Sequence, residues 1–424
     1  MPRFQTPRGT RDFPPEEMMK RQYVFDTIRQ VFESFGFSPM ETPAFESWEL
    51  LSAKGGGGEE VKDEIYYFRD KSNRELGLRF DLTVPMARFV ASNPQLAKPF
   101  KRYQIGRAWR YDRPQAGRFR EFWQADVDVI GAEGTDADAE CIAVAVEALK
   151  RLGFSRFTVR LNSRKVLNST IKSAGVDAKD AAQVFRALDK LEKIGEAEVL
   201  KELKSAVGGK QAAVIMKMIK TKGAPSSLLK GNIEGVSELR EVVEKAKAYG
   251  FADRIMVDFS LVRGLDYYTG PIFEISVQAK KNVGSVGGGG RYDNLIGLLG
   301  GAKSPATGIS LGVERLMEIM SDESMFSLPA SRTKAFIVAV KPELKAEALA
   351  IAKRLRSEGI AVQTDLMGRN MKKQLEYADA CSIPYAIIVG DKELKEKRFL
   401  LKDMSKKIQK AMSVEQIARA LGKA

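Results

Sequence analysis

Two long strand-like runs between residues 101 and 132 constrain the fold more than any other part of the sequence. "KRYQIGRAWRYDR" and "FREFWQADVDVIGA" are rich in aromatic and branched residues, and "PQAGR" between them contributes Pro114 and Gly117. Runs of this kind around a Pro/Gly loop are typical of a β-hairpin. We therefore expect a long antiparallel pair of strands, which excludes an all-helical fold.

The same hairpin carries arginines interleaved with aromatic residues: Arg107, Arg110, Arg113, Arg118 and Arg120 with Trp109, Tyr111, Phe119, Phe122 and Trp123. Strand alternation places Arg118, Arg120 and Phe122 on one face, and Phe119, Glu121 and Trp123 on the other. A face of guanidinium groups beside an aromatic ring can hold a polyphosphate and stack a base above it. Taken alone, the pattern is more often a solvated basic hairpin, so both interpretations stay open here.

Composition narrows the class of partner. The chain has 424 residues, 44% of them hydrophobic, which is enough for two or three cores. Its formal net charge of +14 favours an anionic partner such as nucleic acid, a nucleotide or a membrane surface, although a basic surface kept for solubility is the alternative. Ser331 to Ala424 hold 20 Lys and Arg against 11 Asp and Glu, which predicts a basic C-terminal module.

Several kinds of catalytic site are excluded. The chain contains no histidine, so Ser-His and Cys-His nucleophiles, histidine metal ligands and an imidazole base are all ruled out. Cys141 and Cys381 fit neither a disulfide framework nor a zinc site, and no Walker A motif is present. Chemistry must therefore come from arginine, lysine, carboxylate, tyrosine and backbone groups, and from metal ions.

The N-terminus "MPRFQTPRGTRDFPPEEMMKR" has no apolar signal core, and the sequence has no run of 18 apolar residues. We expect an unexported cytoplasmic protein that does not interact with membranes.

The periodicity of the chain predicts two domains. Residues 16 to 36 favour a helix, and from about 165 to 249 the pattern is helical and rich in lysine, as in an inserted subdomain. Strands resume with "RIMVDFSLV" and "IFEISVQ", and "SDESMFSLPASRT" is a candidate linker. Beyond it, strand and helix patterns alternate, which predicts a small α/β domain at 331–424 after a first domain at 1–322.

Five segments together carry a family resemblance. "FGFSPMETPAFE", the pair "WRYD" and "RFREF", and "GISLGVERL" resemble motifs 1, 2 and 3 of class II aminoacyl-tRNA synthetases. "RGLDYYTG" and "GGGGRYDNL" resemble the two signature peptides of the histidyl-tRNA synthetase family, which are much more specific. The resemblance covers most of residues 2 to 320, is weaker in the helical insertion and is moderate in the C-terminal domain.

The resemblance implies an α+β fold: a class II antiparallel sheet flanked by helices, a helical insertion and a C-terminal anticodon-binding α/β domain. It also implies a homodimer built around motif 1, with Pro43 near the interface. The implied reaction joins L-histidine and ATP into histidyl-adenylate and then transfers histidine to the terminal ribose of tRNA(His). Mg²⁺ would bridge the ATP phosphates, although the sequence names no side-chain metal ligand.

The resemblance also assigns ATP contacts. Arg263 of "RGLDYY" would reach the α-phosphate and stabilise charge as the histidine carboxylate attacks it. Arg110 would bridge the α-phosphate and that carboxylate. Arg118 and Arg315 would hold the outer phosphates, and Phe122 would stack on adenine. Asp112 would lie near adenine or the acceptor end of the tRNA. The alternatives are a surface ion pair between Arg263 and Asp266 and a solvent-facing cation at Arg315.

For the amino acid, the resemblance assigns Asp81, Thr83 and Gln124 to the α-ammonium group, and Arg110 and Arg263 to the carboxylate side. Asp128 and Tyr268 would bind the imidazole, because neutral imidazole has one N–H donor and one acceptor nitrogen. Asp81 and Asp128 could instead cap strand ends, and Tyr267 and Tyr292 could be pocket wall or core. Glycines 287–290 would let the backbone approach the ligand closely.

Lys372 and Lys373 in "NMKKQLEYADA" are candidates for tRNA contact, with a solvated helix face as the alternative. Two rival functions remain. One is a catalytically silent histidine-binding paralogue that regulates histidine biosynthesis, against which the intact "RGLDYY" and the motif arginines count. The other is a synthetase for a different amino acid, such as proline or glycine.

Overall fold

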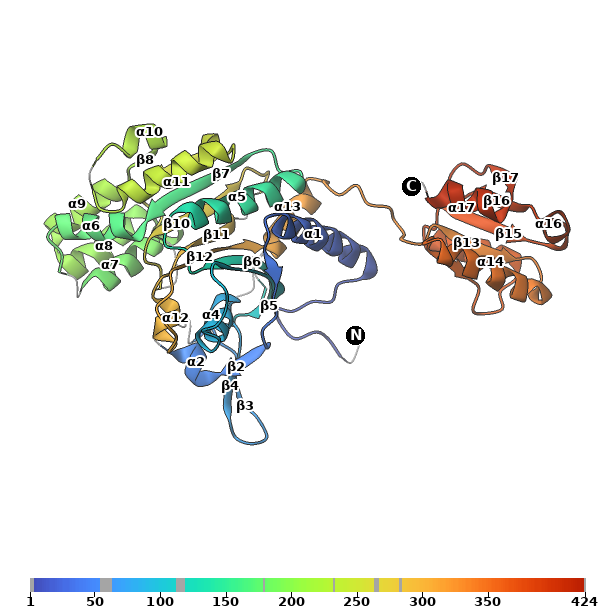
Figure 1. Ribbon diagram of the computed structural model, residues 1–424, viewed down its shortest axis with the longest axis horizontal. Helices are drawn as coiled ribbons and strands as arrows, with labels where there is room; N and C mark the ends of the chain where they lie inside the picture. The colour runs from blue at the N-terminus through green and yellow to red at the C-terminus, as the bar shows by residue number, and fades with distance from the viewer. Residues whose placement is uncertain are drawn as a thin grey trace. The chain divides into compact units, whose positions relative to one another are not determined.

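The computed structural model describes residues 4–53, 63–111, 119–177, 180–231, 233–262, 267–281 and 284–422, without the side chains of residues 192 and 193. The chain divides into two compact units, Met1–Phe326 and Ser327–Ala424. The division falls inside the Ser- and Pro-containing segment 321–333 (Figure 1). Each unit has its own sheet and its own hydrophobic core.

A large, mostly antiparallel sheet forms the centre of the N-terminal unit, as the sequence predicts. In the described part of the chain its strand order is β1-β5-β6-β12-β11-β10-β7-β9-β8, and only the pairs β1–β5 and β7–β9 are parallel. In that order the strands are Ser38–Pro39, Phe100–Trp109, Glu121–Ile130, Ala306–Gly312, Ser285–Arg291, Pro271–Val277, Phe157–Ser163, Ile255–Asp258 and Lys222–Gly223.

Strands β5 and β6 form the predicted long hairpin. Arg102 lies opposite Asp128, Gln104 opposite Asp126 and Gly106 opposite Gln124. The residues between these positions on β6, Ala125, Val127 and Val129, are buried in the main apolar core. Because successive side chains of a strand point to opposite faces, the polar residues Gln124, Asp126 and Asp128 share the other face of the sheet.

Four helices cover the apolar face of this sheet, as Figure 1 shows: α1 Pro15–Ser34, α5 Asp136–Arg151, α11 Val236–Ala248 and α13 Val313–Asp322. Helix α1 begins with a proline in its first turn, followed by Glu16 and Glu17, which suit the positive end of the helix dipole. It ends just before Gly36, which has a φ of 76°. A smaller apolar cluster on the polar side of the sheet joins α4 Thr83–Ala91 to α12 Leu295–Leu298.

The segment predicted as a helical insertion contains α6 Arg164–Ser173, α7 Ala181–Asp189, α8 Leu191–Val207, α9 Gly209–Ile219 and α10 Pro225–Leu228. Helices α6 to α9 share a hydrophobic cluster distinct from the main core, which includes Val184, Leu203 and Ile215 and also takes in Ile272 of β10. Helix α11, at the end of the segment, instead packs in the main core through Leu239 and Val242. The insertion therefore rests on a separate small core.

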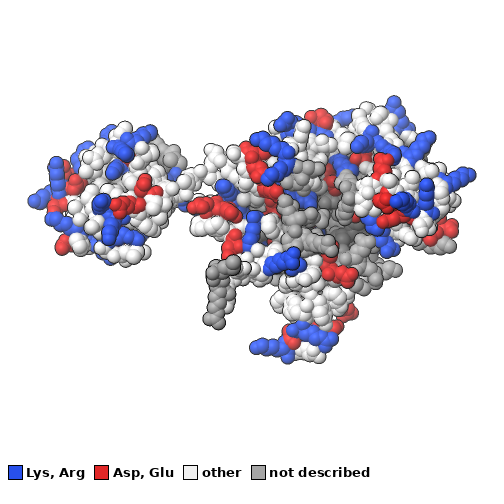
Figure 2. Space-filling view, turned by 180° about the vertical axis from the view of Figure 1, so that it is seen from behind, with Lys and Arg blue, Asp and Glu red and all other residues white. Residues whose placement is uncertain are grey.

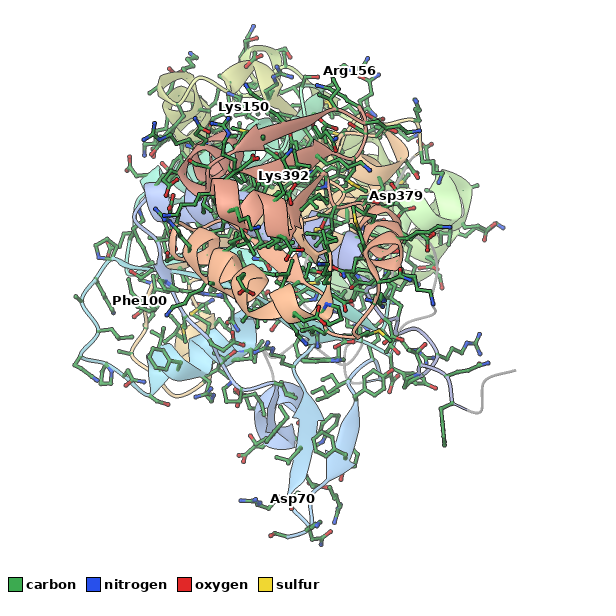
Figure 3. All side chains as sticks on the ribbon, turned by 90° about the vertical axis from the view of Figure 1, so that its right-hand side faces the viewer. Asp70, Phe100, Lys150, Arg156, Asp379 and Lys392 are labelled. Carbon is green, nitrogen blue, oxygen red and sulfur yellow. The ribbon has the colours of Figure 1, made fainter. Side chains whose placement is uncertain are left out.

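A three-stranded sheet of order β2-β4-β3 also belongs to the N-terminal unit. Its strands are Phe45–Ser47, Glu75–Leu78 and Tyr67–Arg69, and α2 Trp48–Ser52 follows β2. The β3–β4 hairpin projects from the unit with Asp70 at its tip (Figure 3). Charged side chains surround this tip (Figure 2), where Arg74 pairs with Asp70 at 2.7 Å and Arg69 with Glu75 at 2.8 Å.

The C-terminal unit is the expected small α/β domain. Its described strands follow the order β14-β13-β15-β16-β17, namely Val362–Thr364, Ala335–Ala339, Tyr385–Val389, Phe399–Asp403 and Gln409–Met412. Strand β13 pairs in parallel with β14 and β15, while β16 and β17 are added antiparallel. Its helices are α14 Lys345–Ser357, α15 Met371–Ala380, α16 Asp391–Glu396 and α17 Val414–Gly422.

Among the described residues, no helix is both long enough and apolar enough to span a membrane.

Candidate active site

The polar face of β6 is the centre of the site. Asp126 and Asp128 are only 3% and 2% exposed, and Gln124 is half-buried with its Nε2 donating to Ser310 Oγ at 2.8 Å. Gly308 on β12 lies beside Asp128, and a Cβ there would be 2.0 Å from Asp128 Oδ1. A glycine is therefore required at position 308 if Asp128 is to keep this orientation.

Asp128 is held by two side chains from different elements. Arg102 Nη2 lies 2.5 Å from Asp128 Oδ2, and the Tyr292 hydroxyl donates to Asp128 Oδ1. Arg102 is fully buried and also donates to the Leu82 carbonyl at 3.2 Å. Burial raises the pKa of Asp128, while Arg102 and Tyr292 oppose this rise by favouring the ionised carboxylate. The carboxylate thus has a fixed orientation at the base of the site.

Asp81 and Thr83 come from the segment that leads into α4. Asp81 Oδ1 accepts from the Val84 backbone N–H in the first turn of α4 at 3.0 Å, which is a contact with a helix and not with a strand end. Its other oxygen, Oδ2, is buried without a hydrogen-bond partner among the described residues. Burial raises the pKa of Asp81 to about 6, opposed by the Val84 N–H and by Arg110.

Asp126 has a similar environment. Burial raises its pKa to about 7; Arg102 and a hydrogen bond with Ser310 oppose this rise, and Asp128 and Asp81 add to it. Its Oδ1 is buried and has no hydrogen-bond partner within the described part of the chain. Asp81 and Asp126 therefore retain protons at a pH where exposed aspartates are ionised.

These raised pKa values predict how stability changes with pH. Unfolded aspartate titrates near its ordinary pKa of 3.8, whereas folded Asp126 titrates near about 7. Between these values the folded state binds more protons, so the contribution of Asp126 to the free energy of unfolding falls as pH rises, by at most about 1.4 kcal/mol per pH unit. Asp126→Asn should therefore gain stability relative to the wild type between about pH 5 and 8.

Tryptophan fluorescence in urea titrations would measure this difference for the correct unit, because all three tryptophans, Trp48, Trp109 and Trp123, lie in the N-terminal unit. Parallel pH profiles for the wild type and Asp126→Asn would contradict the assignment.

Three tyrosines meet at one side of the site. The ring centroid of Tyr267 lies 5.0 Å from that of Tyr268 and 5.6 Å from that of Tyr292. Tyr267 and Tyr292 are buried in the cluster between α4 and α12, and Thr83 hydrogen-bonds to Tyr267. Tyr292 is therefore both core and site wall, because its ring packs in this cluster while its hydroxyl reaches Asp128. Tyr268 lies against Gly290, where a Cβ would be 3.0 Å from its ring.

Arg110 directly follows β5. Its Nε donates to the Phe80 carbonyl at 3.0 Å, and its guanidinium carbon lies 5.4 Å from the centre of the Phe122 ring. Arg107 lies on the opposite face of the same strand, where it pairs with Glu121 at 3.3 Å and covers Trp123. Alternation thus separates one arginine that faces the site from one that does not.

Arg315 lies in the first turn of α13 and donates to the Ser285 carbonyl of β11. The preceding residue, Glu314, is buried and receives a bidentate ion pair from Arg21 of α1 at 2.7 and 2.8 Å. Arg11 adds a further contact to Glu314 at 3.0 Å. Helix α13, and with it Arg315, is therefore fixed to α1 by a buried network.

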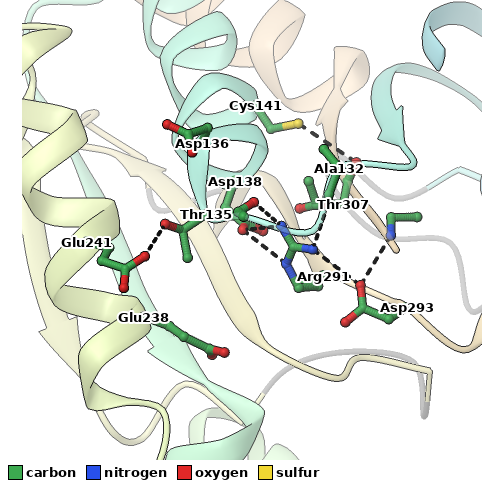
Figure 4. Close-up of polar contacts among 12 residues, drawn as sticks. Ala132, Thr135, Asp136, Asp138, Cys141, Glu238, Glu241, Arg291, Asp293 and Thr307 are labelled. Carbon is green, nitrogen blue, oxygen red and sulfur yellow. Dashed lines mark hydrogen bonds and ion pairs between the residues drawn. The ribbon is translucent and has the colours of Figure 1, made fainter. Parts of the chain in front are cut away.

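A second buried ion pair supports the end of β11, directly before Tyr292. Arg291 Nη2 lies 2.6 Å from Asp138 of α5 and also donates to the Gly134 carbonyl at 2.7 Å (Figure 4). Arg291 Nη1 donates to the Ala132 carbonyl at 3.1 Å. These contacts fix the end of β11, and so they fix where the neighbouring Tyr292 enters the site.

Comparison with known proteins identifies this arrangement. Residues 9–316 match the family described as histidyl-tRNA synthetase, and residues 334–423 match the anticodon binding domain. The chain belongs to the histidyl-tRNA synthetase family. The predicted resemblance is thereby confirmed, together with the class II sheet and the C-terminal anticodon-binding α/β domain.

Individual members of the histidyl-tRNA synthetase family agree along the whole chain. The histidine–tRNA ligase of Aeropyrum pernix is 42% identical over 402 residues, which cover 92% of this chain and 91% of the relative. The crystal structure of histidyl-tRNA synthetase from a Nostoc species matches with a TM-score of 0.86 and 32% identity over all of both chains. A structure from Bacillus halodurans C, described as an ATP phosphoribosyltransferase regulatory subunit/histidyl-tRNA synthetase, matches with a TM-score of 0.75 and 25% identity, covering 89% of this chain and 96% of that one.

The predicted site residues that lie around the polar face of the synthetase sheet are Asp81, Thr83, Arg110, Phe122, Gln124, Asp128, Tyr267 and Tyr268. Arg315 lies in the first turn of α13 and contacts β11. Arg263, Asp112 and Arg118 lie outside the described residues. Lys372 and Lys373 are exposed on the first turn of α15 in the anticodon-binding domain, where Lys372 is 4.0 Å from Glu376.

Sequence reasoning missed Arg102, Asp126 and Ser310. A signal for the first two was present, because the hairpin register pairs Arg102 with Asp128 and strand alternation places Asp126 on the same face. Predicting that register from the sequence would have required the residues at which β5 ends and β6 begins, which the pattern does not fix. Ser310 lies on β12, which pairs with β6 although the two strands are distant in sequence. No local pattern therefore indicated that Ser310 lies beside Asp126.

Proposed function

We propose that this protein ligates L-histidine to tRNA(His) in two steps, through a histidyl-adenylate intermediate. Family membership supports the reaction, and the observation that carries the amino-acid specificity is the buried Asp128 carboxylate held by Arg102 and Tyr292. Attachment of radiolabelled histidine, and of no other amino acid, to tRNA(His) by the purified protein tests the proposal. Failure to charge this tRNA in the presence of ATP and Mg²⁺ would contradict it.

In this proposal the imidazole N–H of the substrate donates to Asp128, and the Tyr268 hydroxyl donates to the other ring nitrogen. Arg102 favours the ionised state of Asp128, and this state can only accept hydrogen bonds. Asp81 and Gln124 bind the α-ammonium group, with Thr83 and Tyr267 forming the adjacent wall. A substrate without the imidazole would lose the proposed hydrogen bonds to Asp128 and Tyr268 after displacing water from both groups, which is the basis of discrimination.

Activation requires a carboxylate oxygen of histidine to attack the α-phosphorus of ATP. The new P–O bond forms as the bond to the leaving pyrophosphate breaks, so negative charge increases around the α-phosphate. We propose that Arg110 and Arg263 stabilise this charge. Arg118 and Arg315 are assigned to the outer phosphates. Phe122 and Asp112 are assigned to the adenine side. The contact between Arg110 and Phe122 supports a common phosphate and base site.

Mg²⁺ is proposed to accompany ATP. Within the described ranges no group of three or more acidic or cysteine side chains could hold a metal ion. Mg²⁺ with a nucleotide normally needs only one or two carboxylates besides the phosphates, so the site fits this mode. We assign Glu274 of β10 to this role because it is aligned across the sheet with Gly288 and Ser310. Its ion pair with Arg160, at 3.2 Å, would be exchanged for the metal ion. The ion would neutralise phosphate charge.

We also propose a homodimer built around motif 1 and a cytoplasmic location, where tRNA charging serves translation. Buried Arg79 supports a role of the motif 1 segment in the site. Its guanidinium donates to the Pro43 carbonyl at 3.3 Å and to the Arg107 carbonyl of β5 at 2.8 Å. A subunit contact at Pro43 would therefore act directly on the hairpin that carries Arg110. We assign catalysis to residues 1–322, with the insertion at about 165–249, and anticodon binding to 331–424.

Asp128→Ala should raise the KM for histidine far more than the KM for ATP. The substitution removes the imidazole partner and leaves Arg102 without its carboxylate, but touches no phosphate group. We expect a loss of about 1–3 kcal/mol in histidine binding. Steady-state kinetics with each substrate varied in turn would measure it, and equal damage to both KM values would indicate a folding role instead.

Lys372→Gln combined with Lys373→Gln should weaken tRNA binding and lower its salt dependence, by about one unit of log–log slope for each lysine that neutralises a phosphate. Adenylate formation should be unchanged, because both residues lie in the other unit. The matched control is the pair Lys406→Gln and Lys407→Gln, which are exposed in the same domain. An identical slope for both double variants would favour a merely solvated face of α15.

A silent regulatory paralogue is the alternative, and the similarity to the Bacillus halodurans protein is the observation that raises it. It is not favoured, because the Aeropyrum relative, at 42% identity, is a histidine–tRNA ligase. A regulatory protein would bind histidine without activating it, so the two functions differ in one measurable step.

A further inference from the structure

Asp126 occupies a place on β6 that the assigned roles leave unused. It lies midway between Gln124, assigned to the ammonium end of histidine, and Asp128, assigned to the imidazole end. Successive residues of a strand rise by about 3.3 Å, so the Cα atoms of Gln124 and Asp128 are about 13 Å apart and Asp126 lies at the middle. Any ligand that contacts both ends must pass over the Asp126 side chain.

The surroundings of Asp126 leave part of its carboxyl unpaired. Its Oδ1 is buried and makes no hydrogen bond with any described residue, a state that costs free energy unless a ligand or water completes it. Hydroxyl or charged groups face it from every element packed around it: Ser310 on β12, Arg102 on β5, Asp128 on β6, and Arg79 and Asp81 from the segment before α4.

Three carboxyl groups, of Asp81, Asp126 and Asp128, lie together here. The guanidinium of Arg102 is fully buried and already paired with Asp128, and Arg110 favours the ionised form of Asp81. Arg79 is largely engaged by the carbonyl groups of Thr42, Pro43 and Arg107. Asp81 also has a buried oxygen, Oδ2, without a partner in the described ranges. A cationic group of a ligand would satisfy these two carboxyl oxygens, Asp126 Oδ1 and Asp81 Oδ2.

We propose that Asp126 is a further histidine-binding residue, which acts with Asp81 as an anionic partner of the substrate α-ammonium group. The inference rests on the proposed histidine-binding function. The ammonium group is the only cation on histidine when its imidazole is neutral. Asp126 is the next residue after Gln124 on this face and interacts electrostatically with Asp81, and Gln124 and Asp81 are the two residues already assigned to that group. Since burial raises the pKa of Asp126 to about 7, the carboxyl must lose its proton as the ammonium group binds.

Three ligands separate this role from a structural one. Histidine carries an ammonium group, a carboxylate and an imidazole; histidinol lacks the carboxylate; imidazolepropionate lacks the ammonium group. Calorimetric titration of the full-length protein should show that Asp126→Asn lowers the affinity for histidine and for histidinol by about tenfold or more. Its affinity for imidazolepropionate should fall by less than about twofold. Glu140→Gln is the matched control, because it also removes one carboxylate. Glu140 lies on α5, where its carboxylate is 2.6 Å from Lys101 Nζ, and this pair is not on the polar face of the sheet.

Asp126→Glu is the second variant, because it keeps the charge. It should retain a preference for histidine over imidazolepropionate that Asp126→Asn loses. The wild-type protein also gives an answer without any variant. Its preference for histidine, corrected for the titration of each ligand in solution, should rise between about pH 6 and 8 as Asp126 ionises.

Equal weakening of all three ligands by Asp126→Asn would overturn the inference and assign Asp126 a purely structural role. A wild-type preference that does not change with pH would overturn it as well, whether or not the variants fold. A wild-type protein that binds neither histidine nor imidazolepropionate would overturn the proposed function itself, which distinguishes the two failures.

Discussion

Arg110→Gln should slow the formation of histidyl-adenylate by roughly 10²–10³-fold, as expected for the loss of one preorganised cation at a developing charge. The Phe80 carbonyl and the Phe122 ring hold the guanidinium in place before any substrate binds, so little reorganisation is needed during the reaction. Single-turnover measurement of adenylate at saturating ATP and histidine reports this step.

Arg107→Gln is the matched control for this prediction. It removes the same group three residues earlier, but from the opposite face of β5, where the side chain is 47% exposed and pairs with Glu121. Its adenylate formation should stay close to the wild-type rate. If both variants lost activity equally, the effect would come from the general basic charge of the hairpin, and Arg110 would have no special role.

Arg263→Gln should have an effect of similar size, roughly 10²–10³-fold on adenylate formation, with little change in ground-state binding of either substrate. This prediction comes from the "RGLDYY" motif, since Arg263 lies outside the described residues. Transfer of histidine from preformed adenylate to tRNA should suffer less, because the α-phosphate is then part of a leaving group already made. Separate single-turnover assays of the two half-reactions measure this asymmetry, and a wild-type rate of adenylate formation would show that the motif is structural.

The parts of the fold that could be predicted are those specified by local patterns. The two strand-like runs on either side of the Pro/Gly loop predicted a hairpin, and β5 and β6 do pair antiparallel. Asp128, chosen by resemblance as an imidazole ligand, is indeed buried on the polar face. The alternation of strand and helix beyond residue 331 was sufficient for the C-terminal α/β domain.

The parts that could not be predicted depend on contacts between segments distant in sequence. Arg21 and Glu314 are 293 residues apart, so neither residue indicates that α1 fixes α13. Strand order brings Ser310 beside Asp126, and no local sequence specifies strand order. One oxygen of Asp81 accepts from the Val84 backbone N–H, while the other remains unpaired within the described residues. A sequence pattern cannot separate the two oxygens of one side chain.

Exchange between pyrophosphate and ATP tests the central claim most directly, because it requires activation of the amino acid and needs no tRNA. Purified protein with ATP, Mg²⁺ and labelled pyrophosphate should incorporate label into ATP when histidine is added, and should not do so with proline, glycine or imidazolepropionate. Asp128→Ala should require much more histidine for the same exchange. Exchange supported by another amino acid would contradict histidine specificity, and tight histidine binding without any exchange would show that the protein is a silent histidine-binding paralogue.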